Sequence, residues 1–258
     1  MITSTRNTKV KQVRALLGQS RERREAGAFV IEGVRLVEEA VRADWPVRFM
    51  FFDETLSGRG QSLVEEIRSR GVELEEASRS VMGSISDTET PQGILAVLDE
   101  FHFPISASLD FVLIPDQIRD PGNLGTLLRS AAAVGVQAVL IPPETTDAFA
   151  PKVLRAGMGA HFHLPVLAMD WDEIERQTRG LVILIADMDG RSCWETDFRQ
   201  PIALIIGNEA EGASESAGRM ADGRIKIPMQ GTVESLNAGV AGSILMFEAI
   251  RQRSQGKD

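Results

Sequence analysis

The sequence contains few of the residues on which several common classes of protein depend. Among its 258 residues are one cysteine, three histidines and no tyrosine. The single cysteine, Cys193, excludes an intrachain disulfide framework and any zinc site made of several cysteines. No Ser-His-Asp catalytic triad can be assembled from the three histidines. We therefore expect no metal ion and a reducing, cytoplasmic setting.

Long apolar runs are absent as well. No run approaches the roughly 18 consecutive apolar residues of a membrane span, and residues 1–14 lack the apolar stretch of a secretory signal. We therefore expect no membrane partner. The length is sufficient for one large domain or two modest ones, each with an ordinary hydrophobic core.

Acidic residues outnumber basic ones, and the formal net charge of −9 argues against a nucleic-acid partner. The charge is unevenly distributed, however. Residues 1–25 carry seven basic and two acidic side chains, a net charge of +5, and the rest of the chain carries a net charge of −14. Val10, Val13 and Leu17 recur at helical spacing, which predicts an amphipathic helix with a basic outer face.

Two interpretations of this basic segment remain open. It is either a solvated helix face or an arm that binds phosphates with an affinity that falls as salt rises. In the second interpretation, the phosphates contact a patch of basic side chains on this arm and on an expected helix at 151–158: Arg21, Arg23, Arg24, Lys152 and Arg155.

The spacing of apolar residues divides the chain into two α/β blocks. In the first block, helices and short strands alternate over residues 32–43, 47–53, 62–70, 72–76 and 93–100. This alternation predicts an α/β domain over residues 1–101. Residues 102–108, which contain Pro104, lack strong periodicity and are expected to be a linker.

The second block, residues 109–258, is more regular. Four continuous apolar runs suit strands buried on both faces of a parallel sheet, and they occupy 109–115, 136–142, 181–187 and 201–207. Helices are expected over 122–135, 151–158, 171–179 and 234–252. This order predicts an open α/β sheet with helices on both faces and a ligand site beyond the carboxyl ends of its strands.

Three segments of the second block carry candidate site residues, and the first is 113–135. A buried strand leads into the turn Asp120-Pro121-Gly122, and Asn123 follows where its amide can cap the next helix or reach outward. Arg129 lies six residues after Asn123, so the two side chains point to different faces of that helix. Spacing alone leaves Arg129 as a solvated residue or a functional one.

The second segment, 205–214, has two glycines in the outline of a phosphate-binding loop. Ala213 stands where that loop requires lysine, and Glu209 and Glu211 would repel phosphates, which excludes a nucleoside triphosphate. No strand is followed by G-x-G-x-x-G, so a dinucleotide dehydrogenase has little support. What remains is a loop whose backbone can approach a ligand closely, with Glu209 orienting a positively charged neighbour or capping a helix.

The third segment, 225–250, begins with a short strand that ends at Pro228 and continues through a loop to Ser235 and Asn237, where a helix begins. The first turns of this helix are rich in small residues and include two glycines. A glycine inside a helix costs about 1 kcal/mol relative to alanine. We therefore expect very close backbone packing around this helix.

Two weaker signals do not indicate a site. His161 and His163 flank Phe162 as alternating strand positions would, and without a third ligand they are expected to be packing or surface residues. Cys193 has no histidine near it in the sequence, which indicates a buried or inert thiol.

Taken together, the three segments resemble the signature of the SpoU (TrmH-type) family of RNA ribose 2′-O-methyltransferases, in the SPOUT superfamily. The matching residues are, in order, Asp120-Pro121, Asn123, Gly125 and Arg129-Ser130-Ala131; Gly207, Glu209 and Gly212; and Ile227-Pro228-Met229, Gly231 and Ser235-Leu236-Asn237. The first block resembles the L30e-like substrate-binding domain of this family at 29–41 and 90–97. Its basic opening is most similar to the mitochondrial and bacterial subgroup that acts on large-subunit ribosomal RNA.

The resemblance implies a fold and a set of partners. The fold would be an N-terminal L30e-like α/β domain followed by a C-terminal SPOUT α/β domain with a deep trefoil knot, a feature that no general rule of topology predicts. The partners would be a second copy in an obligate homodimer, RNA at the basic patch, and S-adenosylmethionine in the knot. The cofactor-binding residues would be Gly207, Ile227, Met229, Leu236 and Asn237.

The resemblance also implies catalytic roles. Arg129 would activate the ribose 2′-hydroxyl, either by lowering the pKa of that hydroxyl and binding the adjacent phosphate or as a transiently neutral base. Asn123 would position Arg129 or the ribose. Glu209 and Ser235 would orient the arginine and shape the loop. Asn237 would hold the third segment near the methionine moiety.

Two alternatives stay open within the same fold. One is a transfer-RNA ribose 2′-O-methyltransferase, and the other is a non-catalytic RNA-binding factor in ribosome assembly. The N-terminal domain favours ribosomal RNA over transfer RNA. The presence of all the motif residues argues against a non-catalytic factor.

Overall fold

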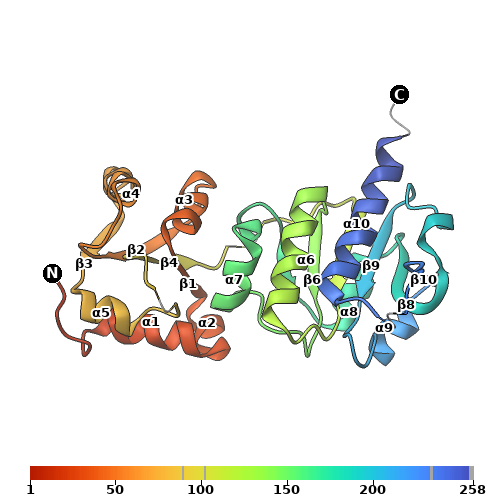
Figure 1. The fold of residues 1–258 in the computed structure, drawn as a ribbon, viewed down its shortest axis with the longest axis horizontal. Helices are drawn as coiled ribbons and strands as arrows, with labels where there is room; N and C mark the ends of the chain where they lie inside the picture. Colours follow the sequence, from red (N-terminus) through yellow and green to blue (C-terminus); the bar gives the residue numbers. More distant parts are fainter. Residues whose placement is uncertain (89, 102, 233–234, 256–258) are drawn as a thin grey trace. The chain divides into compact units, whose positions relative to one another are not determined.

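The computed structural model of the chain describes residues 1–88, 90–101, 103–232 and 235–255, and its backbone divides into two units (Figure 1). The first unit consists of Met1–Phe101 together with Phe149–Phe162, and the remaining described residues form the second. No helix among the described residues is long and apolar enough to cross a membrane.

The first unit is a sheet with helices on both faces (Figure 1). Its strands lie in the order β1-β4-β2-β3, with bounds Ala28–Glu32 (β1), Ile94–Asp99 (β4), Val47–Phe52 (β2) and Glu73–Glu76 (β3). The pairing is antiparallel except between β2 and β3. One face carries α3 (Val34–Arg42) and α4 (Gly58–Ser69), and the other carries α1 (Thr8–Gly18), α2 (Ser20–Ala26) and α5 (Arg79–Ser84).

The basic N-terminal segment is part of this unit's core. Val10, Val13 and Leu16 of α1 are buried against β1, β2 and β4, whereas Leu17, the position expected from the sequence, is only partly buried. The prediction of a single helix for this segment is wrong, because the backbone is extended at Gln19 and a second helix, α2, begins at Ser20.

A segment between β6 and β7 of the second sheet, Phe149–Phe162, groups with the first unit, although it lies within the domain expected over 109–258. It contains α7 (Pro151–Gly157) and a 3-10 turn, Ala160–Phe162, so the buried His161 lies in a turn and not in a strand. The Phe149 ring lies 4.9 Å from that of Phe29, and the Phe162 ring 5.2 Å from that of Trp45. These aromatic contacts explain the assignment.

The second unit has a six-stranded, entirely parallel sheet in the order β10-β8-β9-β5-β6-β7. Its bounds are Phe111–Pro115 (β5), Ala138–Ile141 (β6), Val166–Ala168 (β7), Val182–Ser192 (β8), Ile202–Ile206 (β9) and Gly223–Lys226 (β10). The four strands expected from apolar runs are confirmed, and β7 is an addition to them. The helices are α6 (Pro121–Val134), α8 (Trp171–Gln177), α9 (Glu215–Met220) and α10 (Ala238–Ser254).

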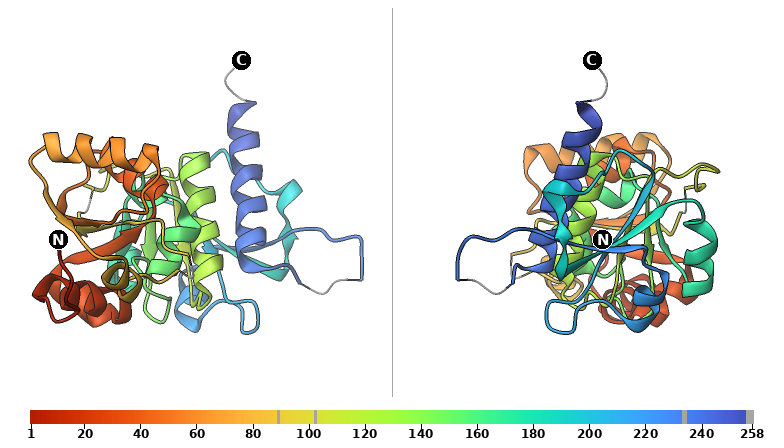
Figure 2. Two further views of the ribbon diagram at one scale, coloured as in Figure 1. Left: turned by 60° about the vertical axis from the view of Figure 1, so that its left-hand side comes forward. Right: turned by 90° about the vertical axis from the view of Figure 1, so that its right-hand side faces the viewer.

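The helix rich in small residues, α10, lies beside α6 (Figures 1 and 2). A Cβ atom at Gly242 would overlap Leu127 Cδ2 and lie 3.1 Å from Ile206 Cγ1. The Ser130 and Ser243 hydroxyls form a hydrogen bond of 2.7 Å between the two helices. The expected close packing is therefore confirmed.

Candidate active site

Polar residues from the three sequence segments meet beyond the carboxyl ends of β5 and β9. Glu209 Oε1 accepts hydrogen bonds from Asn123 Nδ2 at 2.5 Å, from Asn237 Nδ2 at 3.0 Å and from the Ala238 backbone N–H at 3.1 Å. Asn237 Nδ2 also donates to Asn123 Oδ1 at 2.7 Å. One carboxylate oxygen thus joins residues more than 100 positions apart in the chain.

We define Asn123, Glu209 and Asn237 as the triad. Both of its asparagines lie at the start of a helix, which fixes their positions. Asp120 caps α6 and accepts a hydrogen bond from the Asn123 N–H at 2.8 Å, with Pro121 in the first turn. Asn237 itself caps α10 and accepts from the Val240 N–H at 3.2 Å. The sequence left two roles open for the Asn123 amide, capping and reaching outward. Asn237 performs both.

The loop that carries Glu209 is held tightly. The backbones of Asn208 and Gly212 exchange hydrogen bonds of 2.8 and 2.9 Å, and Asn208 Nδ2 donates to the Gln117 carbonyl at 3.1 Å. A Cβ atom at Gly207 would lie 2.5 Å from the Ala213 backbone nitrogen, so a larger residue there would displace the loop.

Asp116, which sequence reasoning missed, anchors the far end of the same loop. Its buried carboxylate accepts the Ser214 backbone N–H at 2.6 Å through Oδ2. Among the described residues, Oδ1 has no hydrogen-bond partner. Burial raises the pKa of Asp116, although the hydrogen bonds from Ser214 oppose this effect. A carboxylate directly after a fully apolar strand was the available signal.

A cavity of about 710 Å³ lies beside the triad, within the usual size range of small-molecule sites. Its walls come from the second and third segments, from the middle of β8 and from the end of β10, and they include Gly207, Glu209, Ile227, Met229, Ser235 and Leu236. Four of the five residues expected at the cofactor therefore line one cavity. The fifth, Asn237, reaches it through its hydrogen bond to Glu209.

This cavity fits S-adenosylmethionine in size and in kind. Apolar side chains such as Ile206, Ile227 and Leu245 offer a surface for an adenine ring. The close-packed backbone at Gly207 and the carboxylates of Asp187 and Glu209 offer acceptors and donors for the polar groups. Within the described residues, no group of three or more His, Cys, Asp or Glu side chains could hold a metal ion.

Arg129 lies outside this cavity. It is exposed on α6, and in the part of the chain that the structure describes its guanidinium makes no hydrogen bond or ion pair. The triad and Arg129 thus occupy different places on the second unit, as the six-residue spacing predicted for Asn123 and Arg129.

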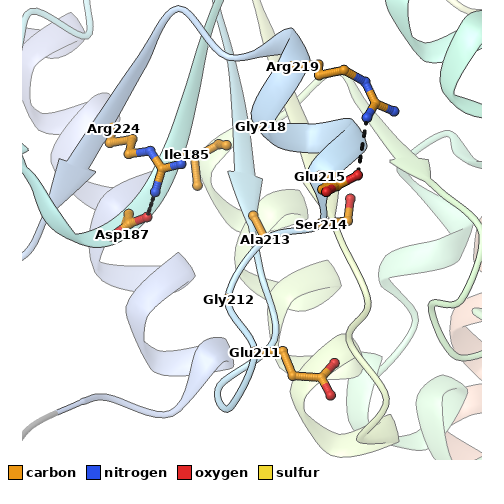
Figure 3. A pocket seen from close by; sticks show the side chains of 10 residues that line it. All are labelled: Ile185, Asp187, Glu211, Gly212, Ala213, Ser214, Glu215, Gly218, Arg219 and Arg224. Carbon is orange, nitrogen blue, oxygen red and sulfur yellow. Dashed lines mark hydrogen bonds and ion pairs between the residues drawn. The ribbon is translucent and has the colours of Figure 1, made fainter.

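A second cavity, of about 550 Å³, shares Asp187, Glu211 and Gly212 with the first. Figure 3 shows its two ion pairs, Arg224 with Asp187 and Arg219 with Glu215. Its charged groups are largely paired with one another, so it offers few free groups to a ligand.

The five candidate basic residues of the first unit have different environments. Arg23 is 6% exposed, and its guanidinium donates to the Leu16 carbonyl at 2.5 Å, at the end of α1. This burial removes Arg23 from the exposed patch. Arg155 pairs with Asp87 at 2.8 Å, and Arg21 with Glu25 at 2.6 Å. The other two, Arg24 and Lys152, are exposed.

The buried thiol of Cys193 agrees with the expectation from sequence. Burial raises its pKa to about 11, so the reactive thiolate is scarce at neutral pH.

A parallel sheet with polar loops converging beside a ligand-sized cavity defines an open α/β protein with a small-molecule site at the carboxyl ends of its strands. Residues 110–247 match the SpoU rRNA Methylase family, and residues 7–96 match the MRM3-like substrate binding domain. The chain belongs to the SpoU rRNA methylase family, as its three motifs indicated.

Similar proteins extend along nearly the whole chain. A 23S rRNA (uridine(2479)-2′-O)-methyltransferase of Streptomyces viridochromogenes is 32% identical and covers 98% of this chain and 93% of that protein. The 23S rRNA (guanosine(2553)-2′-O)-methyltransferase RlmP of Bacillus subtilis is 36% identical, covering 95% and 97%. The crystal structure of the SpoU methyltransferase AviRb from Streptomyces viridochromogenes with AdoMet superposes with a TM-score of 0.84 at 31% identity, covering 97% and 100%.

Proposed function

We propose that this chain transfers a methyl group from S-adenosylmethionine to a ribose 2′-hydroxyl of large-subunit ribosomal RNA. The observation that carries the proposal is the triad of Asn123, Glu209 and Asn237 beside the 710 Å³ cavity. The names of the two relatives and the AdoMet in the similar crystal structure support the reaction, the substrate class and the cofactor.

The residues that would hold S-adenosylmethionine are Gly207, Ile227, Met229 and Leu236, which line the cavity. When bound, the cofactor supplies a methyl group on a positively charged sulfonium, which is already a good leaving group. The chain contributes position: a reacting group held in place reacts much faster than a free one. Ser235 lines the same cavity and would help to shape its wall.

The triad positions the loops and does not supply a base. Glu209 Oε1 already accepts three hydrogen bonds, so its role is to hold Asn123, Asn237 and the start of α10 in register. The acceptor hydroxyl would be activated by Arg129, whose guanidinium can bind the adjacent phosphate and stabilise the forming alkoxide.

The exposure of Arg129 supports a homodimer. On α10, Val240 and Phe247 are 46% and 53% exposed, an apolar stripe at helical spacing. The Ser130–Ser243 hydrogen bond places this stripe next to the face of α6 that carries Arg129. A second copy on this face would bury the stripe and enclose Arg129. The close packing of α10 against α6 and β9 also supports the proposed trefoil knot.

The first unit would bind the RNA substrate. The match to a substrate-binding domain over residues 7–96 supports this role, as do the exposed side chains of Arg21, Arg24 and Lys152. Arg155 is near enough to Asp87 to be partly neutralised, so we expect a smaller contribution from it.

The test is a map of ribose methylation across ribosomal and transfer RNA in cells with and without the gene. We expect one 2′-O-methyl group in large-subunit ribosomal RNA to disappear with the gene and to return when purified protein and S-adenosylmethionine are added. A site lost from transfer RNA would contradict the substrate. An unchanged map together with no S-adenosylmethionine binding in calorimetry would contradict the enzyme and favour a non-catalytic factor.

A further inference from the structure

One ion pair at the site is not explained by the triad or by the cofactor cavity. Arg119 Nη2 lies 3.3 Å from Glu211 Oε2, and the two side chains are 58% and 59% exposed. Arg119 directly precedes Asp120, the cap of α6, and Glu211 lies two residues after Glu209. The pair thus links the same two segments as the Asn123–Glu209 hydrogen bond, on their solvent side.

The loop does not need this pair to keep its shape. Three other contacts already connect the two segments: Asp116 with the Ser214 N–H at 2.6 Å and Asn208 with the Gln117 carbonyl at 3.1 Å, both partly buried, and Asn123 with Glu209 at 2.5 Å. An exposed ion pair adds little stability to a loop held in this way, because water screens the two charges and two flexible side chains must be ordered.

The charges around the site show what Arg119 can do. Glu209, Glu211 and Asp187 line the cavity, so its entrance would repel a polyanion. Lys226 lines the same cavity, and Arg224 is already paired with Asp187. Figure 3 shows Glu211 pointing away from the ion pairs of the neighbouring cavity. Arg119 is therefore the guanidinium beside Glu211 that can be released to an anion.

We infer that Arg119 binds a backbone phosphate of the RNA strand next to the acceptor ribose, and that Glu211 holds it in place until RNA arrives. A guanidinium forms two parallel hydrogen bonds to a phosphate, which are stronger than its single contact of 3.3 Å to Glu211. The exchange leaves the Glu211 carboxylate near the incoming phosphate, so Glu211 opposes RNA binding. The inference rests on the proposed RNA substrate.

The test compares two variants that break the same ion pair, Arg119→Ala and Glu211→Gln. We expect Arg119→Ala to weaken binding of a large-subunit ribosomal RNA transcript about fivefold and to reduce its salt slope by about 0.7, the loss of one contact with a single strand. We expect Glu211→Gln to tighten binding of the same transcript about threefold. Arg119→Lys should keep the salt slope. The affinity for S-adenosylmethionine, measured by calorimetry, should not change in Arg119→Ala or Arg119→Lys, because Arg119 does not line the cofactor cavity.

Arg199 and Asp197 provide the matched control. They form an exposed ion pair of 2.8 Å that precedes β9, at the amino end of the strand whose carboxyl end bears the site. Arg199→Ala and Asp197→Asn should leave the affinity for RNA and the methylation KM as in the wild-type protein.

Opposite effects of the two site variants support the inference. Equal losses of RNA or S-adenosylmethionine binding in both variants would overturn it, because the ion pair would then serve to hold the loop in place. An Arg119→Ala protein that behaves like Arg199→Ala would overturn it too. A wild-type protein that does not bind the transcript would instead contradict the proposed function and the inference that rests on it.

Discussion

The site of the second unit and helix α2 of the first unit use their charged side chains in opposite ways. In the second unit, one carboxylate, Glu209, is shared by three donors from two other segments. On α2 of the first unit, Arg21 and Arg24 are exposed, and Arg21 forms its ion pair with Glu25 on the same helix. A shared network fails as a whole when one member is lost, whereas separate surface charges act one at a time.

The largest effect should follow from breaking the network. Glu209→Ala leaves the Asn123 amide and the Ala238 N–H without their acceptor and removes one of the two acceptors of the Asn237 amide. The loop thereby loses these links to α6 and α10. We expect the rate of a single turnover, measured with labelled S-adenosylmethionine, to fall about 100-fold, as small misplacements of reacting groups do. Glu215→Ala on α9 is the control. A rate within twofold of wild type for Glu209→Ala would show that the triad does not organise the site.

The helix contact behind the network can be broken separately. Gly242→Ala places a methyl group where Leu127 Cδ2 lies, and overpacking of this kind costs about 1–3 kcal/mol. Gly218→Ala on α9 meets nothing within 4 Å and should raise stability by up to about 1 kcal/mol. Urea denaturation measures both. Shifts of the same sign and size would mean that helix propensity, and not packing, decides the effect.

Within the first unit, Arg23 differs from the exposed basic residues because it is buried. Its buried guanidinium satisfies the Leu16 carbonyl at the end of α1, so Arg23→Ala should lower the free energy of unfolding by about 1–3 kcal/mol. Arg24→Ala, one residue away and exposed, should leave it within about 0.5 kcal/mol of wild type. Thermal unfolding of the two variants provides the measurement. An Arg23→Ala protein as stable as the wild type would contradict the structural role of Arg23 and would leave it among the candidate basic residues of the surface patch.

Asp116 provides a test by pH. Burial raises its pKa above 3.8, so the folded protein holds this proton more tightly than the unfolded chain. Its contribution to stability is complete below pH 3.8 and is lost as pH rises through the folded pKa. We expect Asp116→Asn, whose amide oxygen can still accept the Ser214 N–H, to gain stability over wild type as pH rises.

Asp197 should behave in the opposite way. Its exposed carboxylate pairs with Arg199, which lowers its pKa to about 2, so its contribution is present above pH 3.8 and is lost as pH falls. Urea denaturation at several pH values compares Asp116→Asn with Asp197→Asn. Parallel pH profiles for the two variants would contradict the role given to burial.

The same contrast explains how much could be predicted from sequence. Four strands of the second sheet are continuous apolar runs, and the site lies at the carboxyl ends of β5 and β9, so both followed from local pattern. The placement of Phe149 and Phe162 against the first unit depends on rings that come together only in the fold. Arg23 was indistinguishable from Arg24 for the same reason: burial depends on the turn at Gln19, which no periodicity marks.

The smallest effect should come from the separate charges of the first unit. Arg21 and Arg24 are exposed on α2, and removal of both should weaken RNA binding severalfold and reduce the salt slope by about 1.4, two phosphate contacts on a single strand. Arg59 and Arg68 on α4 are the matched control. Both are exposed, each forms an ion pair with a glutamate, and α4 covers the other face of the same sheet. Salt titrations of the Arg21→Ala/Arg24→Ala and Arg59→Ala/Arg68→Ala proteins compare the two faces. Equal slopes would mean that the basic residues on α2 are a solvated face and do not bind RNA.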